Sequence, residues 1–229
     1  MSRAHRTTGA RVITLDGLSG SGKSTLARAL ARALGWSFLD SGAWYRALTW
    51  AVLESGADPS DAEAVLSTLS TIRITSSEDG TVAVDGTVLG QALRTARIDA
   101  AVGRVADHPP VRAELVRRMR AAASAASGLV ADGRDAGTVI FPDAGLKVFV
   151  DVAAAERARR RHAQAGGDEA GRSLAEVRRA LDERDARDSA RGEAAPRIPA
   201  DGTVLDNNRN TVEEAVGRLL LLAREQFPA

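Results

Sequence analysis

Short apolar segments alternate with longer amphipathic segments along most of the chain. Five apolar runs have the length and composition of buried strands, and they cover residues 12–15, 36–39, 129–131, 148–150 and 203–205. Segments with helical spacing separate these runs, up to residue 34 after the first run and then at residues 43–54, 61–70, 111–126, 153–164, 173–191 and 212–225. This alternation predicts an α/β fold with a parallel sheet that helices cover on both faces.

A different pattern occupies the region between residues 72 and 90. Two short alternating runs, 72–75 and 81–84, are separated by the turn-forming sequence SSEDG and followed by Asp85-Gly86. The pattern predicts a small antiparallel sheet inserted into the larger fold.

The composition is that of an ordinary globular protein, and it narrows the choice of partners. The 229 residues carry a net charge of +1, so no field of the whole molecule favours nucleic acid or an anionic membrane. No apolar run approaches the roughly 18 residues that cross a bilayer. The absence of cysteine fits a cytoplasmic protein. We expect residues 1–10 to be a disordered leader and residues 11–229 to form a single domain.

All but two of the 31 basic residues are arginines, so the positions that keep lysine are informative. Lys147 precedes an apolar run, and we interpret it as the solvated end of a strand. Lys23 lies between the first strand and the first helix. There Gly17, Gly22, Lys23 and Ser24 match the pattern G-x-x-x-x-G-K-[ST].

This glycine-rich segment predicts a phosphate-binding loop, or P-loop. Its backbone N–H groups can curl around phosphate without Cβ clashes, and the following helix adds the positive end of its dipole. Lys23 can bridge the β- and γ-phosphates, and the Ser24 hydroxyl can be a ligand of Mg²⁺. We predict that a nucleoside triphosphate is bound by Gly17, Leu18, Ser19, Gly20, Ser21, Gly22, Lys23, Ser24 and Thr25.

A P-loop serves GTPases, motors, transporters and small kinases. The sequence has no N-K-x-D segment of the kind that reads guanine, and no apolar strand that ends in Asp-Glu as in motors and ABC proteins. A small kinase remains, and such an enzyme gathers positive groups around two anions while it excludes water.

Four stretches supply such positive groups, namely DSGAWYR, RTARIDAAVGRVADHPPVR, ADGRDAGTVIFPDA and LDERDARDSAR. In the last stretch, Arg184, Asp188 and Arg191 have spacings of i, i+4 and i+7, which place them on one helix face. From the residues alone, that face could instead be a solvated, salt-bridged surface, and Arg112 could be a surface residue. The candidates are Asp40, Ser41, Tyr45, Arg46, Arg94, Arg112, Asp132, Arg134, Asp135, Arg184, Asp188 and Arg191.

The sequence resembles the bacterial cytidylate kinases, which are nucleoside monophosphate kinases of the P-loop NTPase class. The resemblance extends from Val12 to the last helix and rests on ITLDGLSGSGKST, FLDSGAWYRALTW, LVADGRDAGTVIFPDA and LDERDARDSAR. It implies ATP-dependent, Mg²⁺-assisted phosphorylation of CMP and dCMP by a monomer. It also implies a nucleoside-monophosphate-binding insert at about residues 66–106 and a helical lid at about residues 157–191.

The resemblance also implies roles for individual side chains. Ser41, Tyr45, Arg46 and Arg134 would bind the acceptor, mainly at its phosphate. Arg112 and Asp135 would read the cytosine edge, and Arg184 and Asp188 would hold the ribose and phosphate. Arg187 and Arg191, with arginines near Arg157–Arg161, would neutralise the transferred phosphoryl group. The residues expected to act in catalysis are Lys23, Arg134, Arg184, Arg187 and Arg191.

Three positions depart from the family's pattern. Leu18 replaces a frequent proline at a variable position of the P-loop, and we expect little effect. Gly103 stands where some members have a serine that helps to bind the base amino group, which loosens the expected selection for cytosine. Ala136 replaces a usual methionine and would enlarge the acceptor pocket slightly.

Two other functions were weighed against this one. A sibling kinase could act on UMP or a sugar acid, and a non-nucleotide acceptor would not need the base-reading pair Arg112 and Asp135. A nucleotide-gated module that grips nucleic acid would need a basic groove with stacking aromatic residues. The near-zero net charge and the single tyrosine argue against such a groove, so we expect no nucleic-acid partner and no membrane partner.

Overall fold

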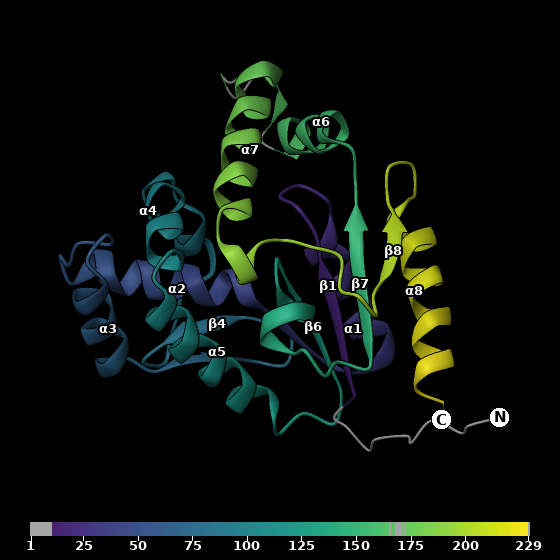
Figure 1. The fold of residues 1–229 in the computed structure, drawn as a ribbon, viewed down its shortest axis with the longest axis horizontal. Helices are drawn as coiled ribbons and strands as arrows, with labels where there is room; N and C mark the ends of the chain where they lie inside the picture. Colours follow the sequence, from purple (N-terminus) through teal and green to yellow (C-terminus); the bar gives the residue numbers. More distant parts are fainter. Residues whose placement is uncertain (1–10, 165, 168–170, 172, 229) are drawn as a thin grey trace.

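The computed structural model describes residues 11–164, 166, 167, 171 and 173–228, and a five-stranded parallel sheet forms its centre (Figure 1). The expected leader, residues 1–10, lies outside the described residues. The strand order is β2-β6-β1-β7-β8, so the loop that follows β1 leaves from the middle of the sheet. The predicted parallel sheet is therefore confirmed, with strands β1 (Val12–Asp16), β2 (Ser37–Asp40), β6 (Leu129–Gly133), β7 (Leu146–Asp151) and β8 (Thr203–Asp206).

The helices lie close to the predicted positions because their end signals are local. Ser173 and Thr211 each form a capping box with the glutamate three residues later, and Gly35 ends the first helix at φ 66°. The α-helices are α1 (Lys23–Leu34), α2 (Ser41–Glu54), α3 (Ala62–Thr71), α4 (Ala96–Ala106), α5 (Pro109–Ala123), α6 (Ala154–Gln164), α7 (Leu174–Ser189) and α8 (Val212–Gln226).

Helix α4 was not among the predicted elements, although its pattern is present in the sequence. Ile98, Ala101 and Val105 are buried at helical spacing, and the Thr95 side chain caps the amino end by accepting from the Ile98 N–H. The helix matters for the site because it carries Asp99 and Gly103.

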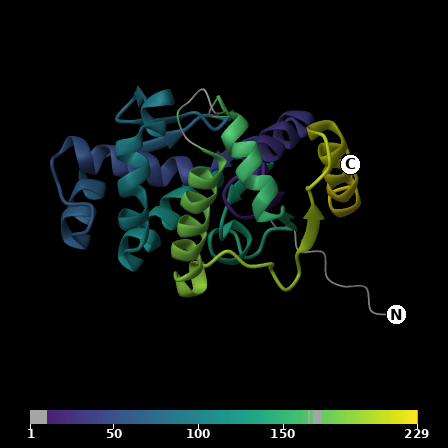
Figure 2. The ribbon, with the colours of Figure 1, turned by 90° about the horizontal axis from the view of Figure 1, so that it is seen from above.

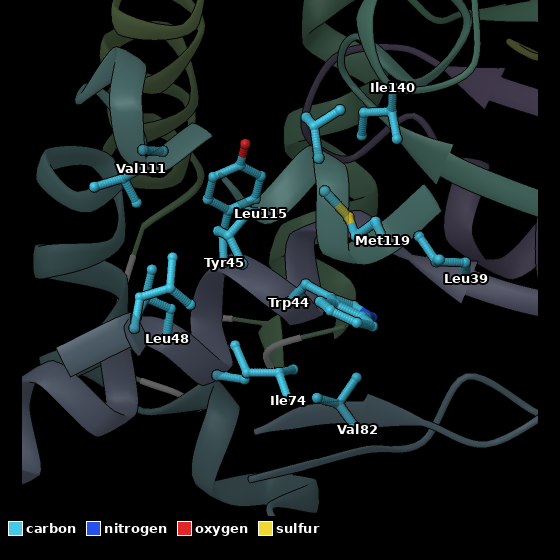
Figure 3. Close-up of a cluster of buried hydrophobic side chains, with 14 of the residues drawn as sticks. Leu39, Trp44, Tyr45, Leu48, Ile74, Val82, Val111, Leu115, Met119 and Ile140 are labelled. Atoms are coloured by element: carbon cyan, nitrogen blue, oxygen red, sulfur yellow. The ribbon is translucent and has the colours of Figure 1, made fainter. Parts of the chain in front are cut away.

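Each face of the sheet has its own hydrophobic cluster, as the alternation of side chains along a strand requires. Ile13 and Leu15 pack with α1 and α8. On the other face, Leu39 and Leu129 pack with α2 and α5, and this cluster continues into the insert. Figure 3 shows the side chains of that second cluster around Trp44.

The predicted antiparallel sheet is confirmed and has one strand more than expected. Strands β3 (Ile74–Ser76) and β4 (Val82–Val84) pair as predicted, and β5 (Thr87–Val88) adds to β4 after a tight turn. Asp85 and Gly86 make this turn with positive φ angles of 49° and 81°. A short 3₁₀ helix, η1 (Gly90–Arg94), then leads to α4.

The interpretation of Lys147 as a solvated strand end is wrong. Its side chain is only 8% exposed, and Nζ forms an ion pair with Asp201 Oδ2 at 2.8 Å. The long aliphatic stem covers apolar surface while the charge meets a carboxylate that is itself exposed.

Helices α6 and α7 lie beyond the carboxyl ends of the central strands (Figure 1). Seen from above, they lie between the blue insert and the yellow α8 (Figure 2). The glycines of the sequence AGGDEAG between them predict a flexible joint, but residues 165 and 168–170 of this segment lie outside the described residues. Within the described part of the chain, no helix is long and apolar enough to cross a membrane.

The tip of the insert rests on the edge of the main sheet. Phe38 N–H donates to Glu78 O at 2.7 Å, and Arg28 Nη1 donates to Asp79 O at 2.5 Å. Gly80, at φ 81°, lies directly on the Phe38 ring, which leaves no room for a Cβ.

We predict that Gly80→Ala destabilises the protein more than Gly86→Ala, which serves as a matched control. Both positions have φ 81°, so both substitutions carry the left-handed backbone cost of about 1–2 kcal/mol. Only an alanine at 80 meets the Phe38 ring, which should add about 1–3 kcal/mol of overpacking. Urea unfolding of both variants measures the difference, and equal losses would show that the insert tip does not pack on β2.

Candidate functional site

A cavity of about 810 Å³ lies at the carboxyl edge of the sheet, between the P-loop, the insert and helices α6 and α7. These two helices make up most of the segment that was predicted to be a lid, and the name lid is used for them below. Gly17, Leu18 and Ser21 of the predicted site are not in its wall. The predicted residues that line it are Ser19, Gly20, Gly22, Lys23, Ser24, Thr25, Asp40, Ser41, Tyr45, Arg46, Arg94, Arg112, Asp132, Arg134, Asp135, Arg184, Arg187, Asp188 and Arg191. One cavity therefore brings together residues that lie up to 172 positions apart.

The P-loop has the backbone that its glycines predict. Gly20 and Gly22 have φ angles of 80° and 84°, which place them in the left-handed region. At Gly17 the constraint is close approach, because a Cβ there would lie 2.5 Å from Val150 O of β7. Lys23 Nζ folds back over the loop and donates to Leu18 O at 3.3 Å.

The floor of the cavity holds a buried group of opposite charges. Burial and the neighbouring Arg134 lower the pKa of Lys23, while burial and Asp40 raise the pKa of Asp132. The Ser24 hydroxyl donates to Asp132 Oδ2, and Asp132 Oδ1 has no hydrogen-bond partner. Lys23 and Asp132 thus face each other in a site from which water is largely excluded.

The Ser24 hydroxyl and the Asp132 carboxylate fit a Mg²⁺ site by their chemistry. Mg²⁺ prefers oxygen ligands and is commonly held by one or two protein groups together with phosphates and water. The unpartnered Asp132 Oδ1 provides such an oxygen. The described residues contain no cluster of three or more His, Cys, Asp or Glu that could hold a metal by itself.

The loop after β6 is fixed by a carboxylate that the sequence reasoning overlooked. Asp16, at the end of β1, is fully buried and accepts hydrogen bonds from Ala136 N–H and Gly137 N–H, both at 2.7 Å. These N–H groups begin η2 (Ala136–Ile140), a single π-helical turn. Asp16 immediately precedes Gly17, and that position at the end of a buried strand is the sequence signal that could have identified it.

The predicted base-reading residues meet at the insert end of the cavity. Arg112 Nη2 donates to Asp135 Oδ2, and Arg112 also lies 5.2 Å from the centre of the Tyr45 ring. Burial raises the pKa of Asp135, and Arg112 opposes that shift. Burial raises the pKa of Tyr45 to about 12, so its hydroxyl stays protonated.

Arg46 and Ser41, both predicted at the acceptor phosphate, make different contacts. Arg46 reaches into the insert, where Nη1 donates to Leu93 O at 2.9 Å and Nη2 pairs with Asp99 Oδ1 at 2.5 Å. The Ser41 hydroxyl donates to the backbone carbonyl of Asp132 at 2.8 Å. Its hydrogen is therefore used to hold α2 against β6, which leaves its oxygen as an acceptor.

Asp188 of the lid orients two of the predicted arginines. Its Oδ2 accepts from Arg134 Nε at 2.9 Å, and its Oδ1 accepts from Arg191 Nη1 at 2.6 Å. Arg191 Nε also pairs with Asp107 at 2.8 Å, which joins the end of the lid to the end of α4. Arg134 Nη1 donates to Gly17 O at 3.1 Å and so reaches the P-loop.

Two lid arginines are held less firmly. Arg184 lines the cavity, and no hydrogen bond or ion pair within the described chain holds its guanidinium. Burial, followed by the charge of Arg134, lowers its pKa to about 10, so it remains a cation at neutral pH. The guanidinium of Arg187 lies beside Gly103, and its Nη1 would be 3.1 Å from a Cβ added at residue 103.

The idea that all of the arginines near Arg157–Arg161 serve the transferred phosphoryl group needs correction. Arg157 is buried, and its guanidinium donates to Val152 O, Ser19 O and Asp185. Arg157 therefore connects the first turn of α6 to the P-loop. Arg160 lies on the cavity wall but donates to Asn207 O at 2.7 Å, and Arg161 lies on the wall as well.

Asn207 is a further residue that the sequence reasoning missed. It is buried just after β8, and its Nδ2 donates to Ser21 O at 3.1 Å, which supports the P-loop from beneath. Nothing in its local sequence identifies this contact, because the two residues are 186 positions apart.

Comparison with known proteins agrees with this geometry. The sequence profile of the cytidylate kinases matches residues 13–225. Cytidylate kinases of Pectobacterium atrosepticum and Stutzerimonas stutzeri are each 43% identical, over 94% and 91% of this chain and 97% and 93% of their own lengths. The crystal structure of TT1252 from Thermus thermophilus shares the fold, with a TM-score of 0.51, 22% identity and coverage of 97% of this chain and 100% of its own. The chain belongs to the cytidylate kinase family and is a phosphotransferase whose acceptor is a phosphate group.

Proposed function

We propose that this protein transfers the γ-phosphoryl group of ATP to the phosphate of CMP or dCMP. The observation that carries the proposal is the single cavity that has the P-loop at one end and the Arg112–Asp135 pair at the other. The P-loop offers backbone N–H groups and Lys23 to a triphosphate, while the opposite end offers a donor and an acceptor to a base edge.

Recognition of cytosine follows from the chemistry of the pair. The Asp135 carboxylate accepts from the exocyclic amino group, and the Arg112 guanidinium donates to the ring nitrogen and carbonyl. Uracil presents a carbonyl where cytosine has its amino group, so it would face Asp135 with two acceptors opposed. Gly103 adds no side chain to this recognition.

In the proposed reaction, an oxygen of the acceptor phosphate attacks the γ-phosphorus as the bond from that phosphorus to the β–γ bridging oxygen breaks. ADP leaves, and the acceptor becomes a diphosphate. No general base is needed because the acceptor phosphate already carries the nucleophilic oxygen. Lys23, Arg134 and Arg184 stabilise the charge on the transferred group, so positioning and electrostatics carry the rate.

The proposal includes Mg²⁺, which the Ser24 hydroxyl and the Asp132 carboxylate would hold. The ion supplies neutralisation of charge on the β- and γ-phosphate oxygens. The proposal also includes a cytoplasmic enzyme without nucleic-acid or membrane partners, for which the lack of cysteine and the net charge of +1 are the support. A monomeric state is part of the proposal because the resemblance to the cytidylate kinases implies it.

A coupled assay of ADP formation tests the function directly. With Mg²⁺ and ATP, we expect turnover with CMP and dCMP at a kcat/KM well above those for UMP and AMP. Equal rates with all four acceptors, or ADP formation that does not depend on an acceptor, would contradict the proposal.

The isosteric change Asp135→Asn should move selectivity from CMP toward UMP. The amide keeps an oxygen for Arg112 and presents N–H groups to the base, which suits the uracil carbonyl. A site that is built to form a hydrogen bond with its substrate can discriminate by several kcal/mol against a ligand that cannot form this bond. Because the substitution removes this discrimination, we expect the CMP-to-UMP ratio of kcat/KM to fall by about 10²-fold or more. The assay above measures the ratio, and a proportional loss for both acceptors would show that Asp135 does not read the base.

Arg184→Ala should lower kcat/KM for CMP strongly and change ATP affinity little. A charge-assisted phosphate contact that strengthens in the transition state contributes about 3 kcal/mol, or roughly 10²-fold. Arg179→Ala is the control, because Arg179 is exposed on the same helix and does not line the cavity. Turnover and ATP titration are measured in both variants. If ATP binding weakens as much as turnover, Arg184 belongs to the donor side.

A further inference from the structure

The contact between Arg46 and Asp99 places a carboxylate beside a proposed phosphate ligand. Arg46 comes from α2 and Asp99 from the first turn of α4, and both line the cavity. The ion pair measures 2.5 Å, with the Arg46 side chain 17% exposed and the Asp99 side chain 44% exposed. The pair is thus accessible to a ligand in the cavity.

Asp99 also acts on Arg184, a second cation of the cavity. The pKa of Arg184 is lowered mainly by burial and Arg134, and Asp99 is among the groups that oppose this shift. Arg46, Asp99 and Arg184 therefore lie in one electrostatic neighbourhood, which is where an acceptor phosphate would be bound.

The second contact of Arg46 differs in kind. Nη1 donates to a backbone carbonyl, Leu93 O, which fixes the guanidinium without adding a full negative charge. The carboxylate of Asp99 takes one N–H of Nη2, so three of the five N–H donors of Arg46 remain for a ligand. A phosphate bound to these donors lies beside the Asp99 carboxylate and meets its negative charge.

We propose that Asp99 is a competing carboxylate that weakens the binding of phosphate-bearing acceptors through Arg46. This inference rests on the proposed function, because it assigns the acceptor phosphate to Arg46. Asp99 acts as a positioning residue and does not itself touch the acceptor. The same repulsion acts on the diphosphate product and so favours its release.

The alternative is that Asp99 serves only the fold. An acidic residue in the first turn favours a helix through the dipole, and the ion pair also joins α2 to α4. If Asp99 had only this role, its substitution would lower the melting temperature and would change the affinities for CMP and for cytidine, which lacks the phosphate, by the same factor. The ratio of CMP affinity to cytidine affinity therefore separates the two roles.

The test is calorimetric titration of the full chain and of Asp99→Asn with CMP and with cytidine. Asparagine keeps an oxygen for Arg46 and removes the charge. Because Asp99 is partly exposed, we expect CMP to bind about 3- to 10-fold more tightly and cytidine to bind as before. Asp99→Ala is the second variant, since alanine suits a helix, and the same increase in the CMP-to-cytidine ratio is expected.

The control is Glu54→Gln. Glu54 pairs with Arg97 at 3.0 Å across the same two helices, and neither residue lines the cavity. This variant makes the same change in net charge and should bind both ligands as the wild type does.

Unchanged or weaker CMP binding in both Asp99 variants would overturn the inference. Equal tightening for cytidine, or equal tightening in Glu54→Gln, would overturn it as well. If the wild type turns over CMP and the Asp99 variants bind it normally, only the inference is wrong. If the wild type neither binds nor turns over CMP, the proposed function is wrong and the inference falls with it.

Discussion

The buried carboxylate of Asp16 is the interaction on which the geometry of the site depends. Asp16 ends the strand that leads into the P-loop, and it accepts the N–H groups of Ala136 and Gly137 just beyond Arg134 and Asp135. Burial raises its pKa to about 6, so at neutral pH it remains an anion that both N–H groups can satisfy. One carboxylate thereby fixes the donor loop and the acceptor loop relative to each other.

The same principle of internal pairing explains how a basic site exists in a chain of net charge +1. Asp188 lies between Arg134 and Arg191, and Asp135 pairs with Arg112. The arginines are therefore concentrated in the cavity while carboxylates within the same cavity limit the field outside it. The result is a local concentration of positive charge in the cavity, which suits anionic ligands.

The sequence predicted the strands, most helices and the cavity residues because these depend on local periodicity and on short motifs. It could not predict pairs such as Ser24 with Asp132, which lie 108 positions apart and meet only through the strand order. The expectation that the arginines near Arg157–Arg161 serve the transferred phosphoryl group fails at Arg157 for a related reason. An arginine in a basic helix looks the same in sequence whether it lines the cavity or, like Arg157, is buried and donates to a P-loop carbonyl.

The lid is joined to the rest of the site before any phosphate contact is considered. Arg157 links α6 to Ser19 O and to Asp185 of α7, while Asp188 links α7 to Arg134. These pairs already hold the long side chains in defined rotamers. The side chains therefore lose less conformational freedom when a ligand binds. Phosphoryl transfer needs charges in fixed positions, and carboxylates hold most of these charges near the places where phosphate oxygens would replace them. Arg184 and Arg187 line the cavity from α7, and no hydrogen bond or ion pair within the described residues holds their guanidinium groups. These two cations can therefore respond to the ligand.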